Sequence, residues 1–306
     1  MDGLTLRRLL ADALNEDHDT SEFIPAKTSY DYLYQAAVEF ANRTRPTTAT
    51  QTITTVADQT AYTLDQDFLK LYVKDDSNRL YIPYSNGSTV DYLYEKDKGD
   101  VIHDNNTTSV AQPNFFYIDD ATLGSNVTGT ATANGTASNG EATLTASAST
   151  FETDGVEVGD LVHNTTDGSS GVVLEVTSET ALVTAIFSNA GNYNDWATDD
   201  TFVITKQPRL QLVIDPPPST AGHTITVYYI QRPDPVYADF RQYRFDNQYG
   251  PALVRYAAWL YKYRDREPDF GDKWYMYFDR QLRQFGVKIN EQRGRKGFSV
   301  NMKKNR

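Results

Sequence analysis

The sequence of 306 residues contains no cysteine and only four histidines. Without cysteine the chain can form no disulfide, zinc-thiolate site, iron-sulfur cluster or thiol nucleophile. No two histidines lie within one helical turn, and the H-E-x-x-H zinc motif is absent. No apolar run approaches the roughly 18 residues that cross a bilayer, and the first residues form no long apolar stretch, so we expect neither a membrane span nor an export signal.

The sequence motifs of the common catalytic sites are also missing. No G-x-x-x-x-G-K-[ST], G-x-G-x-x-G or G-x-S-x-G string occurs, which argues against phosphate-loop, dinucleotide-binding and serine-hydrolase sites. The 41 acidic residues allow many carboxylate pairs, but none stands out as a glycosidase pair. From the absence of these motifs we predict no catalytic residue, cofactor or metal site.

Three clusters of Asp and Asn residues are candidate calcium sites, the alternative to a chain without a metal site. They are 75–78, 104–106 and 192–200, and none matches the EF-hand loop. Clusters of Asp and Asn are typical of solvated turns, which is how we interpret them.

Positive charge is scarce until late in the chain. Residues 1–231 hold 12 basic and 32 acidic side chains, whereas residues 232–306 hold 17 and 9. Residues 121–205 contain no Lys or Arg, 11 acidic residues and 9 of the 18 glycines. The chain thus has an acidic body with a basic end, and residues 121–206 stand apart as a separate module.

Both ends of the chain predict helices. Leu6, Leu10 and Leu14 lie on one face of a first short helix, and a second begins near Thr28, which resembles a helix cap, and stops before Pro46. Near the C-terminus, a helix follows Asn247 and ends at Pro268, and another follows Asp269 and stops at Gly286. Apolar stripes on these helices predict one bundle, and the candidate residues for helix or subunit packing are Trp259, Phe270, Trp274, Phe278 and Phe285.

Short runs of Thr, Val, Ile and Tyr between Asp, Asn and Gly predict strands in the middle of the chain. The expected strands of one antiparallel sheet are 50–56, 61–64, 69–74, 79–83, 89–94, 115–119, 210–214 and 224–231. Inside the module we expect strands at 155–162, 171–176, 181–187 and 201–204. Residues 124–149 are low in complexity and read as either a linker or an exposed strand.

The module lies where a tight turn would otherwise join strands 115–119 and 210–214. Insertions at the tip of a hairpin are tolerated, because doubling the length of a loop raises the entropic cost of closing it by only about 0.6 kcal/mol. We therefore predict an α+β fold in which a helical bundle and an antiparallel β domain carry a second, small all-β domain inserted in a hairpin. The expected divisions are 1–46, 47–120, 121–206, 207–236, 237–290 and a basic arm over 291–306.

The basic arm combines cations with alternating apolar side chains. It contains Arg293, Arg295, Lys296, Phe298, Val300, Met302, Lys303 and Lys304. Such a segment either binds an acidic partner or is a solvated tail.

The order of these pieces resembles the head-to-tail adaptor (connector) proteins of tailed bacteriophages, in particular the short-tailed and SU10-like adaptors. The likeness rests on the N-terminal Leu/Arg helix and on the segments 42–46, 61–70, 115–118, 210–216, 225–229 and 249–253, all outside the module. Within the module, 158–162, 191–196 and 200–204 look like a β domain inserted in other phage virion proteins.

The resemblance implies a structural protein of the virion neck, not an enzyme, assembled in the host cytoplasm. Copies would form a homo-oligomeric ring, a dodecamer in the family, that joins the portal protein to a tail protein of nozzle, tube or hub type. The arm would bind the portal, and double-stranded DNA would pass through the lumen during ejection without sequence-specific binding. The first alternative is a tail fibre or baseplate-type protein whose β module recognises a host-surface glycan. The second is an enzyme that depolymerises such a glycan.

Overall fold

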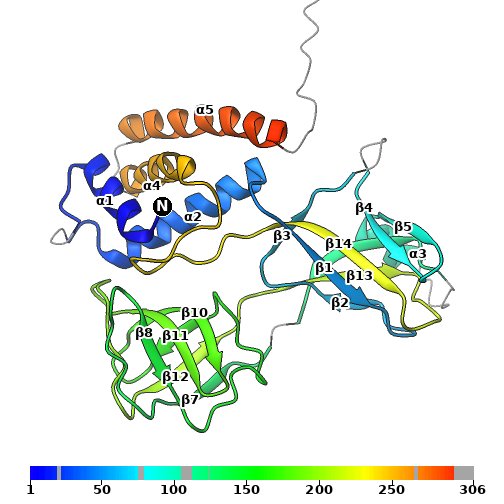
Figure 1. Cartoon of the computed structure of the whole chain (residues 1–306), viewed down its shortest axis with the longest axis horizontal. Coiled ribbons are helices and arrows are strands. Elements are labelled where there is room, and N and C mark those ends of the chain that lie inside the picture. Colours follow the sequence, from blue (N-terminus) through cyan, green and yellow to red (C-terminus); the bar gives the residue numbers. More distant parts are fainter. Residues whose placement is uncertain (19–21, 75–78, 105–111, 123, 265–267, 293–306) are drawn as a thin grey trace, which may run out of the picture.

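The structure, a computed structural model, describes residues 1–18, 22–74, 79–104, 112–122, 124–264 and 268–292. It is an α+β protein in which a group of helices and two curled β-sheets form three parts (Figure 1). The helices of the described residues are α1 (Gly3–Leu14), α2 (Ala26–Thr44), α3 (Lys98–Asp104), the 3-10 turn η1 (Asn247–Tyr249), α4 (Gly250–Arg264) and α5 (Pro268–Gln292).

Helices from both ends of the chain share one hydrophobic core. α4 contacts α1, α2 and α5, and all four contribute to a single cluster of buried side chains. The cluster includes Leu6, Leu10, Phe40, Leu253 and Phe278, so the apolar stripes seen in the sequence do face one another.

Three helix boundaries differ from the sequence-based expectation. α5 begins at Pro268, so Asp269, the predicted cap, lies inside the helix. α2 begins at Ala26, directly after Pro25, and no side chain caps it, so the predicted cap at Thr28 is wrong. The ring of Pro25 fixes its φ angle at −58°, close to the helical value, whereas its ψ angle of 154° is extended, so the helix starts at the next residue. α5 continues through Gly286 to Gln292, because the buried side chains of Leu282 and Phe285 hold it on the core and offset the roughly 1 kcal/mol that a helical glycine costs.

The first sheet contains eight strands. They are β1 (Thr48–Thr54), β2 (Ala61–Thr63), β3 (Phe68–Leu71), β4 (Tyr81–Ser85), β5 (Val90–Glu95), β6 (Phe115–Asp120), β13 (Leu210–Asp215) and β14 (Thr224–Gln231). Their order is β1-β14-β4-β5-β6-β13-β2, with β3 also paired to β14. All eight agree with predicted strands to within a few residues.

The expectation of a purely antiparallel sheet is wrong at one pair. β5 and β6 run parallel, and a parallel pair needs a crossover rather than a tight turn. The connection contains α3, which the sequence analysis did not predict. At the sheet's two ends, the Gln51 side chain of β1 donates to the Thr63 carbonyl and accepts from the Asp65 amide, both at 3.2 Å, so the curled sheet is joined across its edges.

The module, residues 121–206, forms the second sheet. Its strands are β7 (Val127–Thr130), β8 (Ala142–Thr145), β9 (Leu161–Asn164), β10 (Ser170–Ser178), β11 (Ala181–Phe187) and β12 (Thr201–Thr205), in the order β7-β12-β9-β10-β11-β8. β7 and β8 show that 124–149 is not a linker. Residues 155–160 turn instead of forming a strand, since Gly155 and Gly159 have positive φ angles of 67° and 97°.

The pairing that flanks the module agrees with the prediction. β6 and β13 pair antiparallel, with Phe115 opposite Asp215 and Asp120 opposite Leu210. The module therefore begins and ends at the same end of one strand pair. A core of its own, which includes Phe151, Trp196 and Phe202, fills the space inside its sheet.

Candidate interaction surfaces

The basic arm of the sequence analysis, from Arg293 to Lys304, lies outside the described residues. Its assignment to portal binding stays a prediction. The side chain of Phe270 is likewise outside the described set.

The four other packing candidates divide into two pairs. Phe278 and Phe285 are buried in the helical core, where Phe278 packs on Tyr256 with ring centroids 4.8 Å apart. Trp259 and Trp274 are only half-buried. The first pair therefore stabilises the single copy, whereas the two tryptophans lie where the helices meet the surface.

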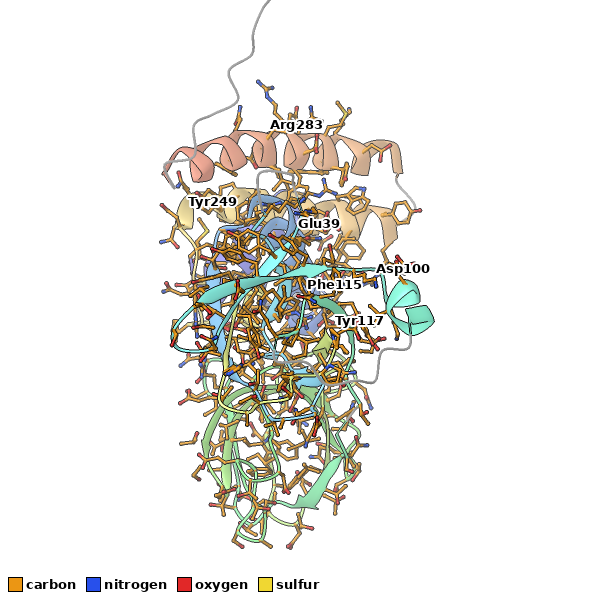
Figure 2. All side chains as sticks on the ribbon, turned by 90° about the vertical axis from the view of Figure 1, so that its right-hand side faces the viewer. Glu39, Asp100, Phe115, Tyr117, Tyr249 and Arg283 are labelled. Atoms are coloured by element: carbon orange, nitrogen blue, oxygen red, sulfur yellow. The ribbon has the colours of Figure 1, made fainter. Side chains whose placement is uncertain are left out.

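The outer side of α5 carries what we term the helical patch: Lys273, Met276, Tyr277, Arg280 and Arg283. Spacings of three and four residues place these side chains on one helix face, and Arg283 lies on the outward side of α5 in Figure 2. Met276 is 69% exposed and Tyr277 53%. Arg255 of α4 extends over the Tyr277 ring, 5.4 Å from its centroid. The patch is thus apolar at its centre and cationic around it.

A second surface of large apolar side chains lies on the outward face of β4, β5 and β6. We term it the sheet patch: Tyr81, Val90, Tyr92, Tyr94, Phe115 and Tyr117. Inward positions alternate with these and hold buried Ile82, Leu93 and Phe116. The register places Tyr81 opposite Tyr94 and Tyr94 opposite Phe115, so three rings form a row across three strands.

Cations of this chain cover part of the sheet patch. The Arg79 guanidinium lies 4.4 Å from the centroid of the Tyr94 ring, and the Lys96 ammonium 4.9 Å from that of Phe115. Tyr92 stays 48% exposed and Phe115 36%. Phe115, Tyr117 and Asp100 of α3 lie together on the side of the molecule that faces the viewer in Figure 2.

Sequence reasoning did not find the sheet patch, although a signal was present. In YIPYS and FFYIDD the aromatic residues occupy both period-2 sets of positions, and in VDYLYE two tyrosines occupy one set while Leu93 lies in the other. A strand with one face in water has polar residues on that face. Large apolar residues on both faces of neighbouring strands therefore indicate a second apolar surface, of the kind that binds another molecule.

The module contacts the helices through a buried cluster of tyrosines and charges. The Tyr30 hydroxyl of α2 donates to Asp239 at 2.9 Å, and the Tyr193 hydroxyl of the module lies 3.0 Å from both. The Arg7 guanidinium of α1 is 3.7 Å from the Asp239 carboxylate. Around them, Phe187 and other apolar side chains of both parts form one hydrophobic cluster. The module is therefore docked on α2 and on the segment before α4.

An ion-pair group reinforces this docking at the surface. Arg241 binds Glu141 at 2.6 Å and Glu175 at 3.1 Å, both in the module. Exposed ion pairs of this kind contribute about 0 to 1 kcal/mol each. The buried tyrosine cluster is the larger part of the contact.

The tyrosine cluster predicts a loss of stability at alkaline pH. Burial, together with the Asp239 charge, raises the pKa values of Tyr30 and Tyr193 above the ordinary value of 10.0. Above pH 10 the unfolded chain loses phenolic protons that the folded chain keeps, so the free energy of unfolding falls as pH rises. In denaturant titrations between pH 8 and 11, Tyr193→Phe is expected to make this fall shallower, by up to about 1.4 kcal/mol per pH unit. Identical slopes in the two proteins would contradict this role of Tyr193.

A cleft of about 1030 Å³ lies between the module, the first sheet and residues 231–244. Two ion pairs join charged side chains of its lining: Arg209 binds Glu157 at 2.7 Å, and Arg244 binds Asp234 at 2.7 Å. Burial raises the pKa of Glu157, and Arg209 opposes that rise. At the module's side of the junction, Gln66 and the Gln207 amide donate to the Asp160 carboxylate at 3.0 and 2.9 Å.

The described part of the chain gives no support to a metal site or to a membrane-spanning helix. No group of three His, Cys, Asp or Glu side chains there is placed to hold a metal ion. In the calcium candidate 192–200, Asp195 accepts from the Ala137 amide and Asp200 from Asn164 and the Ala197 amide, so both stabilise loops. The candidate 75–78 lies outside the described residues, as do the side chains of 104–106. No described helix has the length and hydropathy of a membrane span.

Comparison with protein-family models gives one decisive match. Residues 121–302 match the family described as SU10 adaptor protein, which is more than half of the chain. The chain belongs to the SU10 adaptor family. A search of curated proteins finds no match.

Membership makes this chain a structural phage protein of the SU10 head-to-tail adaptor type. Adaptors of this family act with portal and tail proteins at the neck of the virion. The matched stretch of the adaptor includes the module, which the resemblance in the sequence analysis had set outside the adaptor pattern. It does not include residues 1–120, where many of the motifs quoted for that resemblance lie.

Proposed function

We propose that copies of this adaptor form a closed ring, dodecameric as in its family, that joins the portal to a tail protein and continues the DNA channel. The family match over residues 121–302 carries the proposal. The geometry supports it through two exposed apolar surfaces, the helical patch and the sheet patch, on a chain in which the expected core positions are already filled. Large exposed patches of this kind are typical of subunit interfaces.

The charge distribution supports an acidic channel protein with a basic docking end. The module has 11 acidic side chains and no Lys or Arg up to residue 205, and acidic surfaces repel DNA phosphates so that DNA passes without sticking. The arm carries the basic residues Arg293, Arg295 and Lys296 with the apolar residues Phe298, Val300 and Met302. We assign the arm to the portal.

We also propose that the module is a separately folding domain inserted between β6 and β13. It has its own hydrophobic core, and both its ends leave one strand pair. Its contact with α2 through Tyr30 and Tyr193 gives it a fixed position rather than a freely tethered one.

The proposed function predicts capture by portal that depends on the arm. The full chain mixed with its portal is expected to sediment as a ring complex and to appear as a ring under the portal in electron micrographs. Removing residues 293–306 is expected to weaken capture at least tenfold, or about 1.4 kcal/mol, because the complex then lacks the apolar contacts and ion pairs that we assign to the arm on the portal. The thermal unfolding of the remaining chain serves as the control and should not change.

Two results would contradict these assignments. If the full chain with portal sediments only as a monomer at micromolar concentration, the ring is wrong. If the truncated chain joins the portal with unaltered affinity, the arm is not the portal-binding segment. The alternative assignment to a glycan-binding tail fibre is not favoured by the family match.

A further inference from the structure

We infer that the helical patch of one copy binds the sheet patch of the next copy, so that these two surfaces form the contact between neighbouring subunits. The inference rests on the proposed ring and names the surfaces that build it. The occupant of each patch is a second copy of this chain.

The two patches are complementary in charge. The helical patch combines Lys273, Arg280 and Arg283 with the neighbouring Arg255, against Asp272 and Asp279. The sheet patch is bordered by the acidic residues Glu95, Asp97, Asp100, Asp119 and Asp120, against Arg79, Lys96 and Lys98. One surface is therefore net positive and the other net negative, which favours their mutual contact over contact of either with itself.

The side chains of the two patches are also of types that bind each other. The sheet patch presents a row of ring faces, and the faces of Tyr94 and Phe115 already accept the cations Arg79 and Lys96 within their own copy. Tyr92 remains half exposed for a further cation or thioether. The helical patch supplies both, as arginines and as Met276.

Their positions make the contact head-to-tail. Arg283 lies on the outer side of α5, whereas Phe115 and Tyr117 lie on a different side of the molecule, over the first sheet (Figure 2). Because one copy presents the two patches in different directions, it uses them on two different neighbours. Such heterologous contacts generate rings when the rotation between copies closes.

The experiment blocks one patch at a time in the full chain and measures assembly by sedimentation with portal present. Met276→Glu with Tyr277→Glu blocks the helical patch, and Val90→Glu with Tyr92→Glu blocks the sheet patch. All four side chains are more than 45% exposed, so the variants should keep the unfolding temperature of the natural chain. Glu152→Lys, an exposed charge reversal in the module, is the matched control and should assemble normally.

Each blocked variant alone is expected to lose ring assembly, with association at least tenfold weaker. Mixed one to one without portal, the two variants should form a species of two copies and no larger one, because only one intact helical patch and one intact sheet patch remain to meet. This dimer in the mixture is a result that a general loss of stability would not produce.

Three outcomes would overturn the inference. If both blocked variants still form rings, the contact lies elsewhere while the proposed ring stands. If mixing yields no dimer, the two patches do not bind each other. If the natural chain itself never assembles with portal, the proposed ring fails and the inference fails with it.

Discussion

Replacing Phe40 by alanine is expected to lower the free energy of unfolding by about 3 to 5 kcal/mol. Phe40 is completely buried on α2, and its ring lies 5.3 Å from that of Phe245, 5.0 Å from Tyr249 and 6.3 Å from Phe285. It therefore joins α2, the segment before η1 and α5 in one contact. Truncation removes buried apolar surface and leaves a cavity between elements from both ends of the chain.

Denaturant titration followed by tryptophan fluorescence measures this change, because Trp259 and Trp274 lie in the affected helices. Phe240→Ala is the matched control. Phe240 is 64% exposed, so its loss should change the free energy of unfolding by less than about 0.5 kcal/mol. Equal effects of the two substitutions would show that α2 does not hold the helical core together.

Replacing Asp239 by alanine is expected to cost about 2 to 4 kcal/mol and to loosen the module. The change removes the carboxylate that accepts from Tyr30 and lies beside Arg7, whose side chain is only 9% exposed. A buried cation left without its partner costs more than the pair contributed. Asp239→Asn keeps an acceptor oxygen but no charge, so its free energy of unfolding should lie between that of the natural chain and that of Asp239→Ala.

The module reports on this change through its own tryptophan. Trp196 is buried in the module core and donates to Thr184 at 3.0 Å. Amide exchange of β10 and β11 should become faster in Asp239→Ala, while the Trp196 signal should still unfold in a cooperative step. If amide exchange in these strands stays unchanged, the tyrosine cluster does not hold the module on the helices.

Strands were the most predictable elements, because their signal is local. In β14 Thr224 and Thr226 alternate with the buried Ile225 and Val227, and the strand matches its predicted range of residues 224–231. The pairing of β6 with β13 also followed from order along the chain, since both strands flank the module.

Helix ends were less predictable than strands. The core packing of Phe285 decided where α5 continues, and no local pattern around Gly286 reports that contact.

The interaction surfaces were predictable only in part. Trp259 and Trp274 were predicted as packing residues, but whether an aromatic residue on a helix faces its own core or the surface depends on how the helices pack. The sheet patch depends on register, which places Tyr81, Tyr94 and Phe115 in a row although they are distant in sequence. The cluster of Tyr30, Tyr193 and Asp239 joins residues from three regions of the chain, and none of them has a distinctive neighbour in sequence.

The sequence by itself determined the class of this protein. Composition excluded thiol and disulfide chemistry, periodicity separated helices from strands, and the absence of basic residues over 121–205 marked the module. These are properties of residues close together in the chain. Tertiary structure alone decided the parallel pairing of β5 and β6, the docking of the module on α2, and the two exposed patches. Each of these depends on which side chains remain uncovered after distant segments have packed, and that is decided by the competition among all possible contacts rather than by any local pattern.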